Sequence, residues 1–142
     1  MKKIYQLLII MVLSLFCTQC KTLLPLPNEN KKYSVQEAKT IIERNLNLQY
    51  KHTPTSVYVS WDCYKVTYAK TNFMVAGGST IPTTSMKHKF IYYSDIGSFK
   101  LYKYPNCYNL VIYNLKGREI NKVISKNLYD LQQMIYAIRS LQ

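Results

Sequence analysis

Hydrophobic residues recur at helical spacing in two stretches of the chain. The first begins at Ser34-Val35-Gln36-Glu37, a capping box in which Ser and Glu, three residues apart, each satisfy a free amide donor. The apolar face of this stretch carries Val35, Ala38, Ile41, Ile42 and Leu46. The second stretch follows Asn127, a residue suited to cap a helix, and carries Leu128, Leu131, Met134, Ile135, Ile138 and Leu141. The pattern predicts an amphipathic helix near each end of the domain.

Between these two helices the pattern changes to β. Residues 57–68 are rich in β-branched and aromatic side chains and are predicted as one long strand, with the short run 72–76 pairing back on it. Further strands are predicted over residues 87–93, 99–104, 108–114 and 119–124. Residues 77–85 are expected to form a loop, and Lys116-Gly117 a hairpin turn. Such strands form an antiparallel meander of about six strands. The predicted fold class is α+β, with residues 33–142 as a single domain.

The beginning of the chain has the layout of a secretory signal. A short basic start, Met1-Lys2-Lys3, precedes an apolar run over residues 4–16. A helix that spans a bilayer needs about 20 apolar residues, and this run is shorter and contains Gln6 and Ser14. We therefore expect a signal peptide, with a permanent membrane anchor as the alternative.

Cysteine follows the apolar run, and no small-residue cleavage site of the A-x-A kind is present. The segment Cys17-Thr18-Gln19-Cys20 resembles the lipobox of bacterial lipoproteins, although Gln19 stands where that family prefers a small residue. The resemblance implies that Cys20 carries the lipid, including an acyl chain such as palmitate, and becomes the first mature residue. Cys17 is the alternative site, but it follows the bulky Phe16. The implied location is the bacterial cell envelope, at the outer membrane or facing the periplasm.

These assignments divide the chain into three parts. Residues 1–19 are the signal peptide, and residues 20–32 are a tether, because two prolines and several polar residues there show no helical or strand period. Residues 33–142 are the domain. The alternative is a secreted protein without lipid, whose N-terminus is an ordinary disordered tail.

The second half of the domain resembles the pleckstrin-homology-like superfold, including its GRAM-type relatives. The resemblance is carried by residues 90–141, in "FIYYSDIGSFKLYKY", "YNLVIYNLKGREINKVIS" and the helix "LYDLQQMIYAIRSL". It implies a bent antiparallel sheet, or a partly open barrel, closed by the C-terminal amphipathic helix. The helix that begins at Ser34 is not part of the pattern of that superfold. A cystatin-like sheet packed by two helices is the alternative.

Composition bears on the partners of the domain. The 142 residues are 48% hydrophobic and 18% charged, which excludes a disordered chain. Nineteen basic residues face 7 acidic ones, and loss of Lys2 and Lys3 with the signal leaves 17 against 7, a net charge of +10. Export argues against nucleic acid as the partner of this charge. The remaining classes are anionic lipid, acidic glycan and acidic protein, in addition to the membrane that holds the N-terminal lipid.

Lysines alternate with tyrosines in the predicted strands. The residues that we expect to contact an anionic partner are Lys87, Lys89, Lys100 and Lys103, on a basic, Tyr-rich sheet face beside the loop 77–85. A simpler interpretation is also open. Tyr suits a half-buried pleated surface, and Lys on strands guards the edges of sheets against mispairing.

The chain shows no motif for catalysis or metal binding, so no catalytic residue, metal or cofactor is predicted. The alternative is a hydrolase that uses Asp62 or Asp95 with His52 or His88. A disulfide between Cys63 and Cys107 is favoured over two free thiols, because disulfides persist outside the cytoplasm. The sequence thus favours a non-catalytic envelope lipoprotein that binds or scaffolds.

Overall fold

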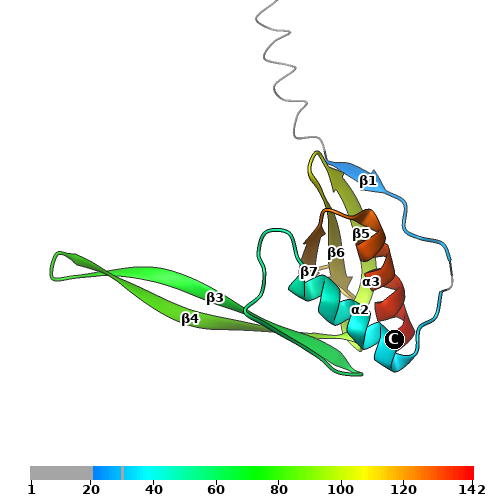
Figure 1. Ribbon diagram of the computed structural model, residues 1–142, viewed down its shortest axis with the longest axis horizontal. Helices are drawn as coiled ribbons and strands as arrows, with labels where there is room; N and C mark the ends of the chain where they lie inside the picture. Colours follow the sequence, from blue (N-terminus) through cyan, green and yellow to red (C-terminus); the bar gives the residue numbers. More distant parts are fainter. Residues whose placement is uncertain (1–20, 30) are drawn as a thin grey trace, which may run out of the picture.

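The computed structural model describes residues 21–29 and 31–142. Within these residues the fold is α+β, with two α-helices and seven strands in two antiparallel sheets (Figure 1). The predicted signal peptide, Cys17 and Cys20 lie outside the described residues. The fold class is therefore confirmed, but the strands form two separate sheets rather than the single bent sheet or partly open barrel that we expected.

The larger sheet has the order β1-β5-β6-β7. Its strands are β1 (Thr22–Leu24), β5 (Ile96–Tyr104), β6 (Cys107–Asn114) and β7 (Glu119–Ser125). The predicted meander is confirmed for β5, β6 and β7. Each of these strands pairs antiparallel with the next one along the chain, and a tight turn joins them.

Strand β1 lies in the segment that the sequence indicated to be a tether without regular structure. It pairs antiparallel with β5, and Leu24 and Leu26 pack against the core. A guanidinium nitrogen of Arg139 donates a 3.2 Å hydrogen bond to the carbonyl of Pro27. The segment therefore lies along β5 and the C-terminal helix, because its leucines have apolar surface to bury there.

The smaller sheet has the order β2-β3-β4, with β2 (Ser56–Val59), β3 (Cys63–Ala76) and β4 (Ser79–Tyr92). The single strand predicted over residues 57–68 is wrong. A turn at residues 60–62 divides it, where the Ser60 amide donates to the Cys63 carbonyl at 2.8 Å. The run 72–76 belongs to β3 and pairs with β4 instead of folding back.

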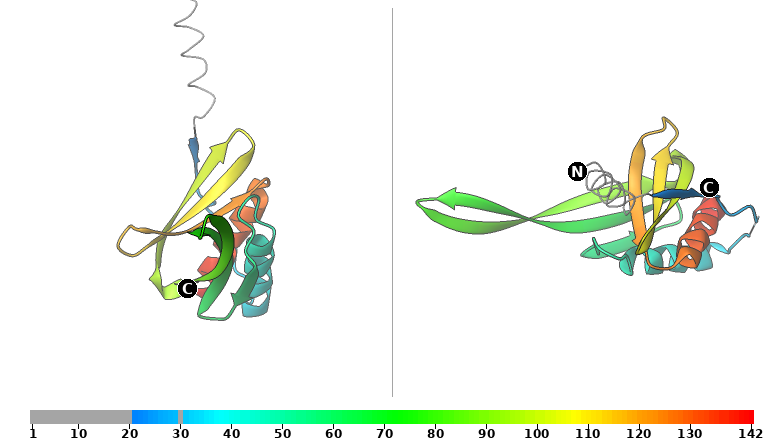
Figure 2. Two further views of the ribbon diagram at one scale, coloured as in Figure 1. Left: turned by 90° about the vertical axis from the view of Figure 1, so that its left-hand side faces the viewer. Right: turned by 90° about the horizontal axis from the view of Figure 1, so that it is seen from above.

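The predicted loop over residues 77–85 is also wrong. Only Gly77 and Gly78 form the turn, and β4 begins at Ser79. Both glycines have positive φ, 60° and 83°, which is the backbone that a two-residue turn of type I′ requires and that matches the twist of the strands. Each of the two strands has 14 residues and is about 46 Å long. Beyond β2, residues 70–85 project from the body, and we call this segment the hairpin arm (Figures 1 and 2).

The two helices lie side by side: the first contacts mainly β2 of the smaller sheet, and the second covers the larger sheet. Helix α2 (Val35–Asn47) begins at the predicted capping box of Ser34 and Glu37, and α3 (Leu128–Leu141) at the predicted cap Asn127. They pack against each other, and α3 covers β6 and β7. Among the described residues, neither helix is long and apolar enough to cross a bilayer.

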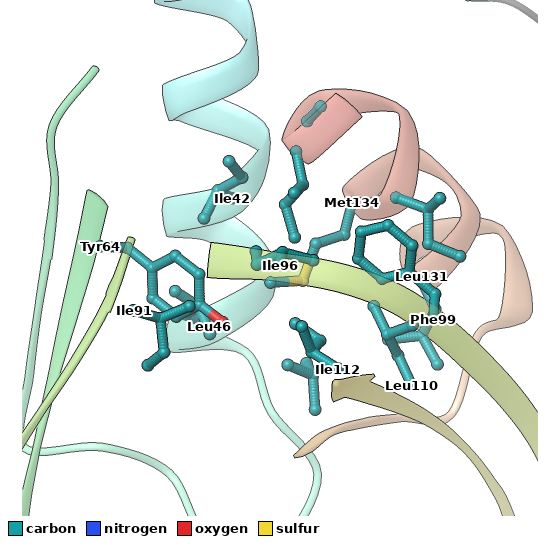
Figure 3. Packing of buried hydrophobic residues seen from close by; sticks show 14 of the residues in the cluster. Ile42, Leu46, Tyr64, Ile91, Ile96, Phe99, Leu110, Ile112, Leu131 and Met134 are labelled. Carbon is teal, nitrogen blue, oxygen red and sulfur yellow. The ribbon is translucent and has the colours of Figure 1, made fainter. Parts of the chain in front are cut away.

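One hydrophobic core joins the helices to both sheets (Figure 3). Tyr64 of β3 and Tyr93 of the short 3-10 helix η2 (Tyr93–Asp95) are fully buried there, with ring centroids 6.1 Å apart. The core side chains labelled in Figure 3 are Ile42, Leu46, Tyr64, Ile91, Ile96, Phe99, Leu110, Ile112, Leu131 and Met134. The shared core thus fixes the position of the hairpin formed by β3 and β4 relative to the larger sheet.

Candidate anion-binding pocket

A cavity of about 600 Å³ lies between the base of the hairpin, the loop before β2 and strand β7. Its volume is in the range of sites that hold small ligands, which is roughly 300–1,000 Å³. We call it the basic pocket, because four of its lining residues are lysines: Lys70, Lys87, Lys89 and Lys122. His52 also lines it, and Glu119 is the carboxylate among the lining residues that the structure describes.

The register of the hairpin places three of these lysines together. Tyr68 is opposite Lys87, Val66 is opposite Lys89, and Lys70 is two residues beyond Tyr68 on the same strand. Because residues directly opposite each other share a face and alternate residues repeat it, all of these side chains lie on one face of the hairpin. Lys122 approaches from β7 of the other sheet. The cations converge from both sheets onto the cavity.

Lys89 is the half-buried cation of this group. Burial lowers its pKa below the ordinary 10.5, the positive charge of Lys87 lowers it further, and the carboxylate of Glu119 partly opposes both effects. A lowered pKa means that the charged form is held at a free-energy penalty. A bound anion would offset that penalty through its Coulombic attraction to the ammonium group.

The loop over residues 48–55 forms a wall of the pocket and has an uncommon backbone. Lys51 and His52 both have positive φ, 60° and 62°, although neither is a glycine. Hydrogen bonds hold the loop at both ends, from the Tyr50 amide to the Ile124 carbonyl at 2.8 Å and from the Thr55 amide to the Thr67 carbonyl at 2.7 Å. Such strained positions cluster at functional sites, where the surrounding structure fixes them.

Neutral polar groups complete the lining. Gln49, Asn109 and Asn121 line the pocket and are buried, and the side-chain amide of Asn121 donates to the Tyr64 hydroxyl at 2.9 Å. Burial raises the pKa of Tyr64, so its hydroxyl stays neutral. Amides, hydroxyls and lysines together can bind a ligand that carries both an anionic group and hydroxyl groups.

The structure divides the four lysines expected to contact an anionic partner. Lys87 and Lys89 lie in the basic pocket. Lys100 and Lys103 lie on β5 of the larger sheet, outside the lining; the ammonium of Lys100 is 5.2 Å from the ring centroid of Tyr113. The expected Tyr-rich surface is also reduced, because Tyr64 and Tyr93 belong to the core.

Lys70, Lys122 and His52 were not predicted to share a site with Lys87 and Lys89. The position of Lys70 could have been predicted from the sequence. A two-residue turn at Gly77 and Gly78 sets a register in which Lys70 lies on the same face of the hairpin as Lys87. The contribution of Lys122 and His52 depends on how the loop and β7 pack, and no local pattern encodes that contact.

The disulfide expected between Cys63 and Cys107 is not formed. Both are free thiols, and they begin strands of different sheets, β3 and β6. Burial raises the pKa of the Cys63 thiol, and the Cys107 thiol donates to the Asn109 side-chain oxygen at 3.8 Å.

The two histidines lie on different elements, His52 in the loop before β2 and His88 on β4. Nδ1 of His88 is 3.0 Å from Oγ1 of Thr67, its partner across the strands on the face opposite the pocket lysines. Asp62 lies in the turn before β3, and Asp95 ends η2. Across the described residues, no group of three or more His, Cys, Asp or Glu side chains is placed to hold a metal ion.

Comparisons with protein-family models, with curated proteins and with solved structures found no match to this chain. The functional conclusion therefore depends on the geometry and charge of the basic pocket.

Proposed function

We propose that this protein is an envelope lipoprotein whose domain binds an acidic saccharide in the basic pocket. The observation that carries the proposal is the convergence of four lysines on a cavity of about 600 Å³ that has one carboxylate in its described lining. Excess positive charge in a partly enclosed site attracts anions and strengthens their binding.

The neutral groups of the pocket favour a sugar over a bare anion. The amides of Asn109 and Asn121 can exchange hydrogen bonds with hydroxyl groups, and the Tyr68 side chain offers an apolar ring beside the cations. The size of the pocket suits one or two sugar units better than the broad surface of an acidic protein.

Binding measurements with acidic oligosaccharides test this function. The full chain is titrated by calorimetry with a uronic-acid oligosaccharide and with the neutral oligosaccharide of the same length. We expect Lys87→Gln to lower the affinity for the acidic oligosaccharide about tenfold, because one charge-assisted hydrogen bond is lost. Lys103→Gln is the matched control, because Lys103 lies outside the pocket. Equal binding of the neutral sugar, or equal loss in both variants, contradicts the proposal.

Attachment through Cys20 is supported by the lipobox resemblance alone. If Cys20 carries the lipid, Lys21 is the single residue between the lipid and β1, which begins at Thr22. The domain would then lie directly against the membrane surface instead of at the end of a flexible tether. Metabolic labelling with palmitate tests this, and we expect Cys20→Ala to abolish the label. A label that survives the change would assign the lipid to Cys17 or exclude the site.

The relation to pleckstrin-homology-like domains is also a proposal. The order of a three-stranded sheet, a three-stranded meander and a C-terminal helix supports it. Helix α2 packs on α3 and is additional to that pattern.

A further inference from the structure

The hairpin arm carries a long uncharged segment at its end. Residues 71–85 include no Asp, Glu, Lys or Arg, and no acidic residue occurs anywhere between residues 63 and 92. Lys70 and Lys87 stand at the two ends of this segment, where the arm meets the body. The arm therefore has a neutral end and a positive base.

The end of the arm exposes large apolar side chains. Phe73 is 70% exposed, Met74 60%, Val75 77% and Ile81 50%. Phe73 and Val75 lie on one face of the hairpin, and Met74 and its partner Ile81 lie on the other. Figure 2 shows that this part of the arm extends away from both helices and from the larger sheet. The tip, residues 73–75 and 80–82, is thus apolar on both faces and covered by neither the helices nor the larger sheet.

A strand from a second protein would not cover these side chains. An added strand pairs along an edge and leaves both faces of the hairpin exposed. On β4, Pro82 also has no N–H to offer. Counting from the two-residue turn, Phe73 and Pro82 form a pair without ladder hydrogen bonds, so this missing donor lies on the outer edge. Pairing along the β4 edge of the tip is therefore disfavoured.

The interface of a lipid bilayer, unlike an added strand, can cover the apolar side chains on both faces of a narrow hairpin. Apolar side chains enter the boundary between headgroups and acyl chains to a depth of roughly 5–10 Å, which is about three residues of a strand. The unpaired backbone groups at the two edges of the tip restrict it to this hydrated depth, because the hydrocarbon centre cannot satisfy them. Lysines behind the tip are attracted to anionic headgroups.

We propose that the tip of the hairpin arm inserts into the interface of an anionic lipid bilayer, with Lys70 and Lys87 on the water side of the headgroups, where the anionic surface attracts them. The apolar side chains of the tip lie outside the basic pocket, whereas Lys70 and Lys87 belong to its lining. The contact does not require a lipid on Cys20. It would hold the hairpin at the membrane through its own side chains.

A fluorescence experiment on the full chain reads the depth of the tip directly. The native Trp61 lies in the turn between β2 and β3, at the opposite end of β3 from the tip, and serves as the matched control. The test protein carries Trp61→Phe and Phe73→Trp, so that its one tryptophan reports on the tip. Both proteins are mixed with vesicles of phosphatidylcholine and phosphatidylglycerol whose acyl chains are brominated. We expect at least about a twofold loss of emission for the tip reporter, as bromine contacts an inserted ring, and little loss for Trp61.

Further variants test whether the tip contacts a lipid bilayer or a second copy of the chain. Lys70→Gln with Lys87→Gln should reduce the quenching on anionic vesicles and leave it unchanged on neutral ones. These exposed changes should not alter the circular dichroism of the domain. Absence of quenching at the tip while the chain remains bound to vesicles overturns the proposal. A concentration-dependent dimer that Val75→Glu abolishes, without quenching by lipid, would assign the tip to a second copy of the chain and also overturn it.

Discussion

The side-chain amide of Asn121 in β7 donates a 2.9 Å hydrogen bond to the hydroxyl of Tyr64 in β3, and this bond joins the two sheets inside the core. Both side chains are buried, and Asn121 also lines the basic pocket. The bond therefore links the packing of the hairpin base to the position of the pocket wall.

Removal of the Tyr64 hydroxyl tests this link. We expect Tyr64→Phe to lower the free energy of unfolding by about 1–3 kcal/mol, because it leaves the buried Asn121 amide without a partner. The double variant Tyr64→Phe/Asn121→Leu should be less destabilised than the sum of the single changes. Urea unfolding measures all three proteins. Strict additivity would show that the two groups do not interact.

Gly97 is required by a close approach between backbones. A Cβ at this position would lie 2.8 Å from the Asn114 carbonyl oxygen and 2.9 Å from the Leu115 Cα, where β5 and β6 have an irregular register. Gly97→Ala should therefore destabilise the domain by about 1–3 kcal/mol, since backbone must move. Ser98→Ala, next to it and exposed, is the control and should change stability by less than about 0.5 kcal/mol. A thermal unfolding series in which the two variants behave alike would refute this reasoning.

Substitution of Lys89 should change the affinity for the saccharide without lowering the stability of the fold. The charged form is penalised by burial in the free protein, so Lys89→Met should leave the free energy of unfolding unchanged or raise it. The same change should lower the affinity for the acidic saccharide about tenfold. Lys103→Met, on β5, should affect neither. If Lys89→Met destabilises the fold by as much as it weakens binding, then Lys89 is structural.

The lowered pKa of Lys89 also predicts the pH dependence of binding. The anion interacts with the protonated amine, so affinity should decrease as pH rises through the Lys89 pKa, which lies below 10.5. The Lys89→Met variant should lose this part of the decrease. Titrations at alkaline pH values at which the fold stays intact provide the comparison. Identical profiles for the two proteins would remove Lys89 from the site.

The sequence predicted those elements whose signals are local. The capping box at Ser34, the cap at Asn127 and the tight turns between β5, β6 and β7 each depend on a few neighbouring residues, and all are confirmed. The fold class followed from their order.

Elements that depend on distant pairing were not predictable in this way. Residues 79–85 contain Pro82 and several threonines and were interpreted as a loop, yet they form a strand because residues 70–76 pair with them. The predicted strand over residues 57–68 divides at the turn over residues 60–62, next to which the Asp62 carbonyl accepts a hydrogen bond from the Tyr93 amide, 31 positions later. Strand β1 likewise forms only where β5 offers an edge.

The candidate site shows the same division. Lys87 and Lys89 were identified because lysines alternate with tyrosines in the predicted strands. Lys122 and His52 enter the pocket through the contact of the Tyr50 amide with β7, and such a contact leaves no pattern in the sequence.

The central claim is that an acidic saccharide binds in the basic pocket, and backbone amide shifts in a two-dimensional NMR titration test it most directly. We expect the largest shifts at His52, Lys70, Lys89 and Lys122, which line one cavity although they lie far apart in sequence. Lys100 and Lys103 should shift little. Shifts that gather around Lys100 and Lys103 on β5, or that spread evenly over all lysines, would contradict the account.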